Sequence, residues 1–344
     1  MMQIRIGVLG IGDITKRRFL PALKKSSTCS LAGIAVATVE ERNQYIPVPM
    51  DKRNDETKRS KAINLAYEYS FAVFDSYESL IRSREVDAVY IPLPPALHYY
   101  WGKRALEEGK HVIMEKPFTT YCGHTGELLE LAKKRGLSVL ENYGFQFHSQ
   151  MEKIRQLVNS KEIGNCKLIK VSFGFPKRDD SDFRYVKELG GGALLDCGGY
   201  TLKAASMFLG ESMEIVSSVL LPMEGHDVDG FGAVTAKNHG GTIAQLSFGM
   251  DNQYKCELEL WGTKGIINAP RIFTAPPDLS VPLRVTRGAN SEEFFIQEDD
   301  QFLKMIEKLH ECVMERNIRE HFYKSIQSQS QYVDLVRKMN GESE

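Results

Sequence analysis

The sequence has little that would place it on nucleic acid, in a membrane or outside the cell. It has 44 lysine and arginine residues against 45 aspartate and glutamate residues, so the formal net charge of -1 offers no basic surface for polyanions. No uninterrupted apolar run approaches membrane length, and the first residues lack the basic and apolar regions of a signal peptide. We therefore expect a cytoplasmic protein that binds neither nucleic acid nor a membrane.

Cysteine is scarce and scattered. The close pairing that builds zinc sites and disulfide scaffolds is missing among Cys29, Cys122, Cys166, Cys197, Cys256 and Cys312. We expect a reducing compartment and no bound metal.

The composition is otherwise that of a globular protein. Of 344 residues, 42% are hydrophobic and 26% are charged. This length exceeds one ordinary core, so we expect two domains.

The chain begins with a strand, a glycine turn and a helix. Residues 3–9 alternate and then become apolar, and Gly10 and Gly12 follow before a helical stretch. Gly10 permits a tight turn, and Gly12 lets the backbone approach a pyrophosphate at a helix N-terminus. Thr15 replaces the third expected glycine, so the fingerprint of a dinucleotide site is incomplete. The candidate cofactor contacts are Gly10, Gly12, Asp13 and Ile14.

The end of the second strand, residues 31–37, bears on the choice of cofactor. An acid usually stands there when the cofactor is NAD, because it binds the ribose hydroxyls. Thr38 occupies the position and Arg42 lies close by, which favours NADP. Glu40 and Glu41 keep NAD open as the alternative.

Residues 43–58 form a polar stretch rich in proline and charge, longer than typical connections. It predicts a mobile surface loop, with a cover over the adenine end as the alternative.

Strands and helices then alternate to the end of a first domain, residues 1–142, which predicts a doubly wound parallel sheet. The expected helices are 59–69, one starting at a Ser76 cap, 99–108 and 124–135; the expected strands are 72–74, 86–91, 111–114 and 137–140.

Two segments follow strand ends at the carboxyl edge of this sheet, where ligands bind in open α/β proteins. The first contains consecutive prolines, which hold the backbone extended as a shelf for a flat ring. Its candidate cofactor contacts are Leu93, Pro94, Pro95 and His98, although an isolated histidine here also fits a cap or a core residue.

The second segment is Glu115-Lys116-Pro117. A partly desolvated lysine at this rim could polarise a carbonyl or a neighbouring phenol. The alternative is a strand-end salt bridge made by Glu115.

The second domain, residues 143–344, has a different character. Alternating segments predict antiparallel strands, and an open sheet of this kind needs cover on its far face. We expect a homodimer or homotetramer built on the sheet. The expected strands are 167–175, 230–237, 242–250 and 254–261; the expected helices are 151–160, 299–315 and 318–338.

A glycine-rich entry at residues 190–192 precedes a predicted helix that carries Asp196 and Tyr200. Their spacing of four places carboxylate and phenol on one helix face, able to grip adjacent substrate oxygens. Tyrosine can donate a proton to a developing alkoxide if an ammonium, such as that of Lys116, stabilises its anion. A capped Asp with a packed Tyr is the alternative.

The order of the glycine turn, the Glu-Lys-Pro segment and the 190–200 segment resembles the glucose-fructose oxidoreductase, inositol dehydrogenase and MocA (Gfo/Idh/MocA) family of nicotinamide-dependent oxidoreductases. The resemblance implies a Rossmann domain and an α+β domain with a large open, mainly antiparallel sheet. It assigns catalytic roles to Lys116 and Asp196. Tyr200 stands where many members have histidine, as in the glucose-fructose oxidoreductase and dihydrodiol dehydrogenase branch.

Further segments, 90–98, 183–185, 259–265 and 271–277, resemble the NDP-sugar 3-ketoreductases. This likeness implies transfer of a hydride between nicotinamide and a sugar ketone or alcohol, with Glu115 and the shelf beside the cofactor. Arg184 and Lys203 are candidates for substrate hydroxyl or diphosphate contacts. An aldose or trans-dihydrodiol dehydrogenase and a non-catalytic dinucleotide sensor remain alternatives.

Overall fold

The computed structural model describes residues 3–45, 54–69, 71–210 and 213–342. The chain divides into two compact units. The first contains residues 1–142, 188–190 and 302–330, and the second contains 143–187, 191–301 and 331–344. The sequence predicts two consecutive domains, residues 1–142 and 143–344. In the structure, residues 302–330 belong to the first unit instead of the second.

The first unit contains a parallel sheet of six strands in the order β3-β2-β1-β4-β5-β6. The order reverses between β1 and β4, so the carboxyl ends of these strands flank the switch point where α/β proteins bind ligands. The predicted doubly wound parallel sheet is confirmed. The strands are β1 (Ile4–Leu9), β2 (Cys29–Ala35), β3 (Ala72–Phe74), β4 (Ala88–Ile91), β5 (His111–Met114) and β6 (Val139–Glu141).

Local signals explain where several helices of this unit begin and end. Ser76 and Ser79 form a reciprocal capping box at the start of α4. Gly136 ends α6 with a φ of 67°, a conformation that glycine adopts without strain. The helices are α1 (Leu20–Lys25), α2 (Val39–Tyr45), α3 (Asn54–Tyr69), α4 (Tyr77–Arg82), α5 (His98–Glu107), α6 (Cys122–Arg135) and α9 (Gln301–Met314).

The predicted loop at residues 43–58 is wrong at both ends. Residues 43–45 complete α2, and residues 54–58 form the first turns of α3. Residues 46–53 lie outside the described part of the chain.

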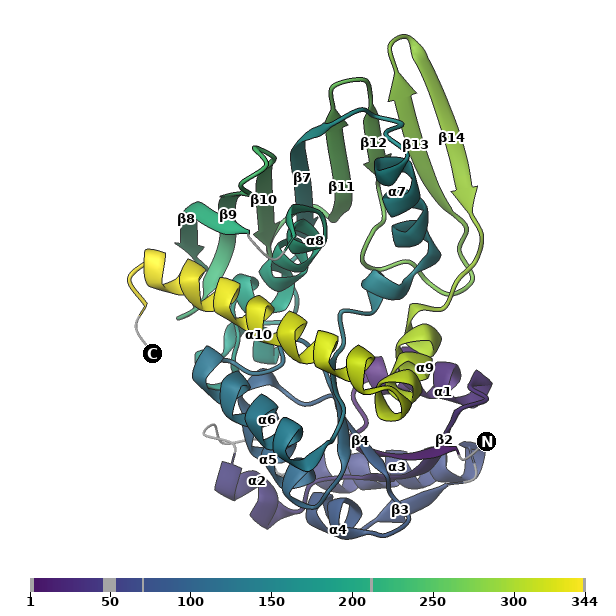
Figure 1. Ribbon diagram of the computed structural model, residues 1–344. Helices are drawn as coiled ribbons and strands as arrows, with labels where there is room; N and C mark the ends of the chain where they lie inside the picture. Colours follow the sequence, from purple (N-terminus) through teal and green to yellow (C-terminus); the bar gives the residue numbers. More distant parts are fainter. Residues whose placement is uncertain (1–2, 46–53, 70, 211–212, 343–344) are drawn as a thin grey trace. The chain divides into compact units, whose positions relative to one another are not determined.

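The second unit contains an eight-stranded sheet in the order β14-β13-β12-β11-β7-β10-β9-β8 (Figure 1). Only β7 and β10 pair in parallel among these neighbours, so the prediction of a mainly antiparallel sheet is confirmed. The strands are β7 (Cys166–Gly174), β8 (Glu214–Pro222), β9 (Asp229–Lys237), β10 (Ile243–Gly249), β11 (Lys255–Gly262), β12 (Ile266–Ala269), β13 (Val281–Arg287) and β14 (Asn290–Ile296).

One face of this sheet carries the core of the unit. On β10, Ala244, Leu246 and Phe248 are buried, whereas Ile243 on the opposite face is 44% exposed. The alternation follows from the two-residue period of a strand. Helix α8 (Gly199–Leu209) packs against β7 and β10 (Figure 1).

Helix α10 (Arg316–Met339) contributes residues to both units. In the first, the Tyr323 hydroxyl donates to the carbonyl of Leu137; in the second, the Asn340 side chain just past the helix accepts from Leu220 N–H at 2.9 Å. Among the residues described, no helix combines the length and apolar character needed to cross a membrane.

Candidate active site

The glycine turn after β1 is open to a ligand. Gly10 has a φ of 92°, which favours glycine, and a Cβ there would lie a close 3.1 Å from the Tyr77 hydroxyl. Gly12 and Asp13 are exposed, and the following residues are helical as far as Lys25. A helix N-terminus behind an exposed glycine turn fits the diphosphate of a dinucleotide.

Thr15, at the third glycine position, is fully buried in a π-helical turn, Thr15–Phe19. Its hydroxyl has no hydrogen-bond partner among the described residues. The chain therefore accommodates a side chain where tighter fingerprints need glycine.

The proline shelf is held by a buried histidine. The His98 ring nitrogens lie 2.8 Å from the carbonyl oxygens of Leu93 and Pro117. Burial lowers the pKa of His98 to about 4, while the hydrogen bonds to these carbonyls oppose the shift. The side chain thus joins the shelf to the Glu-Lys-Pro segment, and its own contact with the cofactor stays a prediction.

Glu115 directly follows β5, and its carboxylate accepts hydrogen bonds from two neutral side chains. Its Oε1 accepts from the Tyr90 hydroxyl and from Asn142 Nδ2, each at 2.6 Å. Burial raises the pKa of Glu115, while these hydrogen bonds and Lys116 oppose the shift. Lys116 itself is half-buried and precedes a cis proline.

In the second unit, Asp196 is paired with Arg184. Arg184 Nε lies 2.7 Å from Asp196 Oδ2, and its Nη1 lies 3.1 Å from Asp182. Burial lowers the pKa of Arg184, but the two carboxylates outweigh burial and the pKa is raised. Arg184 therefore pairs with both carboxylates and orients Asp196. The contact of Arg184 with substrate stays a prediction.

Tyr200 stands at the start of α8 within an aromatic cluster. The rings of Tyr143, Phe145, Phe173 and Phe273 have centroids 5.0 to 5.9 Å from that of Tyr200. Such edge and tilted contacts hold an aromatic ring in one orientation. Tyr200 nevertheless remains half-buried, so its position suits a group that meets a ligand.

The predicted helix that carries Asp196 and Tyr200 is present, with a π-helical turn at Leu194–Gly198. Turns of this kind recur at functional sites because they turn side chains away from regular α-helical positions. Lys203, one turn further along α8, is 4% exposed.

Two protein-family models match the chain. Residues 4–143 match an oxidoreductase family with an NAD-binding Rossmann fold, and residues 151–268 match the GFO/IDH/MocA C-terminal domain. Together they cover more than half of the sequence. The chain belongs to the Gfo/Idh/MocA oxidoreductase family.

Individual relatives extend this result. The chain is 37% identical over 311 residues to a dTDP-3,4-didehydro-2,6-dideoxy-alpha-D-glucose 3-reductase of Streptomyces violaceoruber, covering 90% of this chain and 85% of the relative. A solved 3-ketoreductase from Actinomadura kijaniata, in complex with NADP and TDP-benzene, is 32% identical, with a TM-score of 0.87 and 98% of each chain covered. A trans-1,2-dihydrobenzene-1,2-diol dehydrogenase of Xenopus laevis is 32% identical over 230 residues, 66% of this chain and 69% of the relative.

These findings confirm the family predicted from the sequence. This Gfo/Idh/MocA protein is a nicotinamide-dependent oxidoreductase, and its first unit is the dinucleotide-binding one.

One residue of this Gfo/Idh/MocA site escaped the sequence analysis. Asp229, at the start of β9, accepts from Leu194 N–H at 2.6 Å and so fixes the turn that leads to Asp196. A Cβ at Gly192, whose φ is 111°, would lie 2.2 Å from Asp229 Oδ1. The third glycine of the 190–192 entry is therefore required by this carboxylate. No spacing in the sequence connects the two positions.

Asp229 predicts a pH dependence of stability. Burial raises its pKa from 3.8 to about 6, with Glu342 adding to the shift while Leu194 N–H and Arg337 oppose it. A raised folded-state pKa gives a contribution that is present below pH 4 and lost as the pH rises through 6. We expect Asp229→Asn to abolish this loss, which amounts to at most about 3 kcal/mol.

Urea denaturation of both proteins between pH 4 and 7 measures the effect. As the pH rises, the free energy of unfolding of the wild type should fall relative to that of the variant. Parallel curves would show that Asp229 titrates normally.

Proposed function

We propose that the protein is an NADPH-dependent 3-ketoreductase of a dTDP-linked deoxysugar. The observation that carries the proposal is similarity along nearly the whole chain to enzymes with that reaction in their names, 37% and 32% identical in the two cases compared above. The residues needed for ketone reduction, Lys116, Asp196 and Tyr200, are all present.

The proposed mechanism assigns one task to each of these side chains. The nicotinamide supplies a hydride to the carbonyl carbon of the sugar. Tyr200 gives its phenolic proton to the carbonyl oxygen, and Lys116 stabilises the negative charge that develops there and on the phenolate. Asp196, paired with Arg184, accepts a hydrogen bond from a neighbouring sugar hydroxyl and so fixes the orientation of the ketone.

The choice of NADP rests on the end of β2. Thr38 caps the start of α2, and Arg42 in the same helix donates from Nε to the Thr38 carbonyl at 3.4 Å. A hydroxyl and a guanidinium suit a 2′-phosphate, whereas NAD sites place an acid on the ribose. NADP is also the cofactor bound in the Actinomadura kijaniata structure.

The exposed face of the eight-stranded sheet supports assembly into a homodimer or homotetramer. Apolar side chains of several strands stand on the surface there, with 37% to 61% of each exposed: Val219, Phe231, Ile243, Trp261 and Phe295. A second copy of the chain would cover them.

A substrate panel tests the proposal. With NADPH in excess, we expect loss of nicotinamide absorbance with a dTDP-linked 3-ketosugar, at a kcat/KM at least about a hundredfold above that for free sugars, because the nucleotide adds binding energy. NADH should be the poorer reductant.

The alternative is an aldose or trans-dihydrodiol dehydrogenase, favoured by the 32% identity to the Xenopus laevis enzyme. If the protein oxidises a free aldose or a dihydrodiol faster than it reduces any nucleotide-linked ketone, this alternative is correct and the proposed function is wrong.

A further inference from the structure

Glu41 lies beside the expected ribose site, yet both oxygens of its carboxylate accept hydrogen bonds from the protein backbone. Oε2 accepts from Thr38 N–H at 2.9 Å and from Tyr77 N–H at 3.2 Å, and Oε1 accepts from Glu78 N–H at 3.0 Å. In return, Glu41 N–H donates to Thr38 Oγ1 at 3.1 Å. Three N–H donors on one carboxylate hold it in a single orientation.

These contacts join two helix N-termini. Thr38 and Glu41 form a reciprocal capping box on α2, while Glu41 also satisfies the first two N–H groups of α4. The third N–H of α4, that of Ser79, is satisfied by Ser76. Both helix dipoles favour a negative charge at this point.

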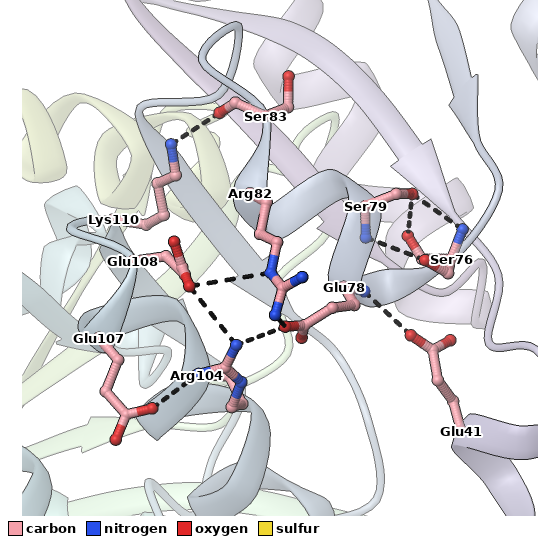
Figure 2. Close-up of polar contacts among 10 residues, drawn as sticks. All are labelled: Glu41, Ser76, Glu78, Ser79, Arg82, Ser83, Arg104, Glu107, Glu108 and Lys110. Atoms are coloured by element: carbon pink, nitrogen blue, oxygen red, sulfur yellow. Dashed lines mark hydrogen bonds and ion pairs between the residues drawn. The ribbon is translucent and has the colours of Figure 1, made fainter.

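The connection continues beyond α4. The backbone N–H of Glu78 donates to Glu41, and Figure 2 shows the Glu78 carboxylate in contact with Arg82 and with Arg104 of α5. Arg104 in turn pairs with Glu107 at 2.8 Å. A polar chain therefore ties the turn at Thr38 through α4 to the last turn of α5.

Tyr77 links the same carboxylate to the glycine turn. Its N–H donates to Glu41, and its hydroxyl would lie 3.1 Å from a Cβ on Gly10. Burial and the nearby Glu41 raise the pKa of the Tyr77 phenol, so it stays protonated. The backbone of Tyr77 is therefore held by Glu41, and its hydroxyl lies near Gly10.

We propose that Glu41 is a positioning residue that selects NADP without touching it. The inference rests on the proposed use of NADP. By holding Thr38 and the first turn of α2 against α4, Glu41 places Thr38 and Arg42 for the 2′-phosphate. The same three N–H contacts keep its carboxylate away from the ribose hydroxyls, which is where an acid would favour NAD.

The direction in which a charge-neutralising substitution changes NADP affinity tests this idea. If Glu41 only repelled the 2′-phosphate, Glu41→Gln would tighten NADP. If it positions Thr38 and Arg42, Glu41→Gln loses at least one N–H contact and weakens NADP about tenfold, and Glu41→Ala weakens it more. Affinity for NAD should change less than about twofold in both variants, since NAD has no 2′-phosphate to misplace.

Dissociation constants for NADP, NAD and adenosine 2′,5′-bisphosphate, measured by titration calorimetry on the full-length protein, give the readout without turnover. Glu40→Gln is the matched control. Glu40 is the neighbour of Glu41 and its side chain is exposed, so the substitution removes the same charge without disturbing the contacts of Glu41. It should leave NADP binding unchanged or slightly tighter. Thermal unfolding shows whether each variant is folded at the titration temperature.

Two outcomes would overturn the inference: tighter NADP binding by Glu41→Gln, or equal weakening of NADP and NAD, which marks a purely structural role. A wild-type protein that binds NAD as tightly as NADP would instead contradict the proposed cofactor.

Discussion

Replacing Tyr200 with phenylalanine lowers kcat by about a hundredfold to ten-thousandfold, the range that a positioned proton donor contributes. The ring stays within the same aromatic cluster, whose four neighbours contact its faces and edges, so packing is retained while the hydroxyl is lost. Dissociation constants for NADPH should change little. Steady-state rates on the dTDP-linked ketone, with NADPH binding measured separately, give both numbers.

Tyr254→Phe is the matched control for this experiment. Tyr254 belongs to the same unit, is 40% exposed and bonds through its hydroxyl to Thr274. It should keep the wild-type rate. If Tyr200→Phe also kept it, the proton would have to come from another group.

Much of the first unit could be predicted because its signals are local. The glycines after β1, the Ser76 cap and the stop at Gly136 each act within a few residues, and each appears where expected. The buried strands also have the continuous apolar pattern of a parallel sheet.

The missed strands of the second unit have weaker patterns for a physical reason. β8 and β14 are the two edges of the sheet, and most residues of β14 are exposed. A strand that buries little shows little alternation of apolar and polar residues. β13 does alternate, with Val281, Leu283 and Val285 buried, but Pro282 within the run argues against a strand.

Thr38 and Glu41 have the spacing of a local capping box, but the role of Asp229 and the contacts of Glu41 with α4 depend on distant backbone N–H groups. Asp229 binds Leu194 N–H, and Glu41 binds those of Tyr77 and Glu78, so only the folded chain brings each donor to its acceptor. The same limit applies to residues 302–330. An amphipathic helix shows that it has a buried face, but not which core covers that face.

Lys116→Met should cost about as much as loss of the tyrosine hydroxyl. Methionine keeps an unbranched apolar side chain at this half-buried position and removes only the ammonium. We expect kcat to fall about a hundredfold to a thousandfold, the cost of one electrostatic stabiliser of a developing oxyanion. Lys133→Met, at a lysine 49% exposed and paired with Glu130, should keep normal rates.

The double variant decides whether Lys116 and Tyr200 serve one proton transfer. Groups that act as a unit are strongly non-additive, so Lys116→Met combined with Tyr200→Phe should be no more than about tenfold slower than the worse single variant. Multiplied losses would mean that the two side chains act on separate steps. In that case Lys116 would assist cofactor binding, and the dissociation constant for NADPH of Lys116→Met alone would rise with the loss of rate.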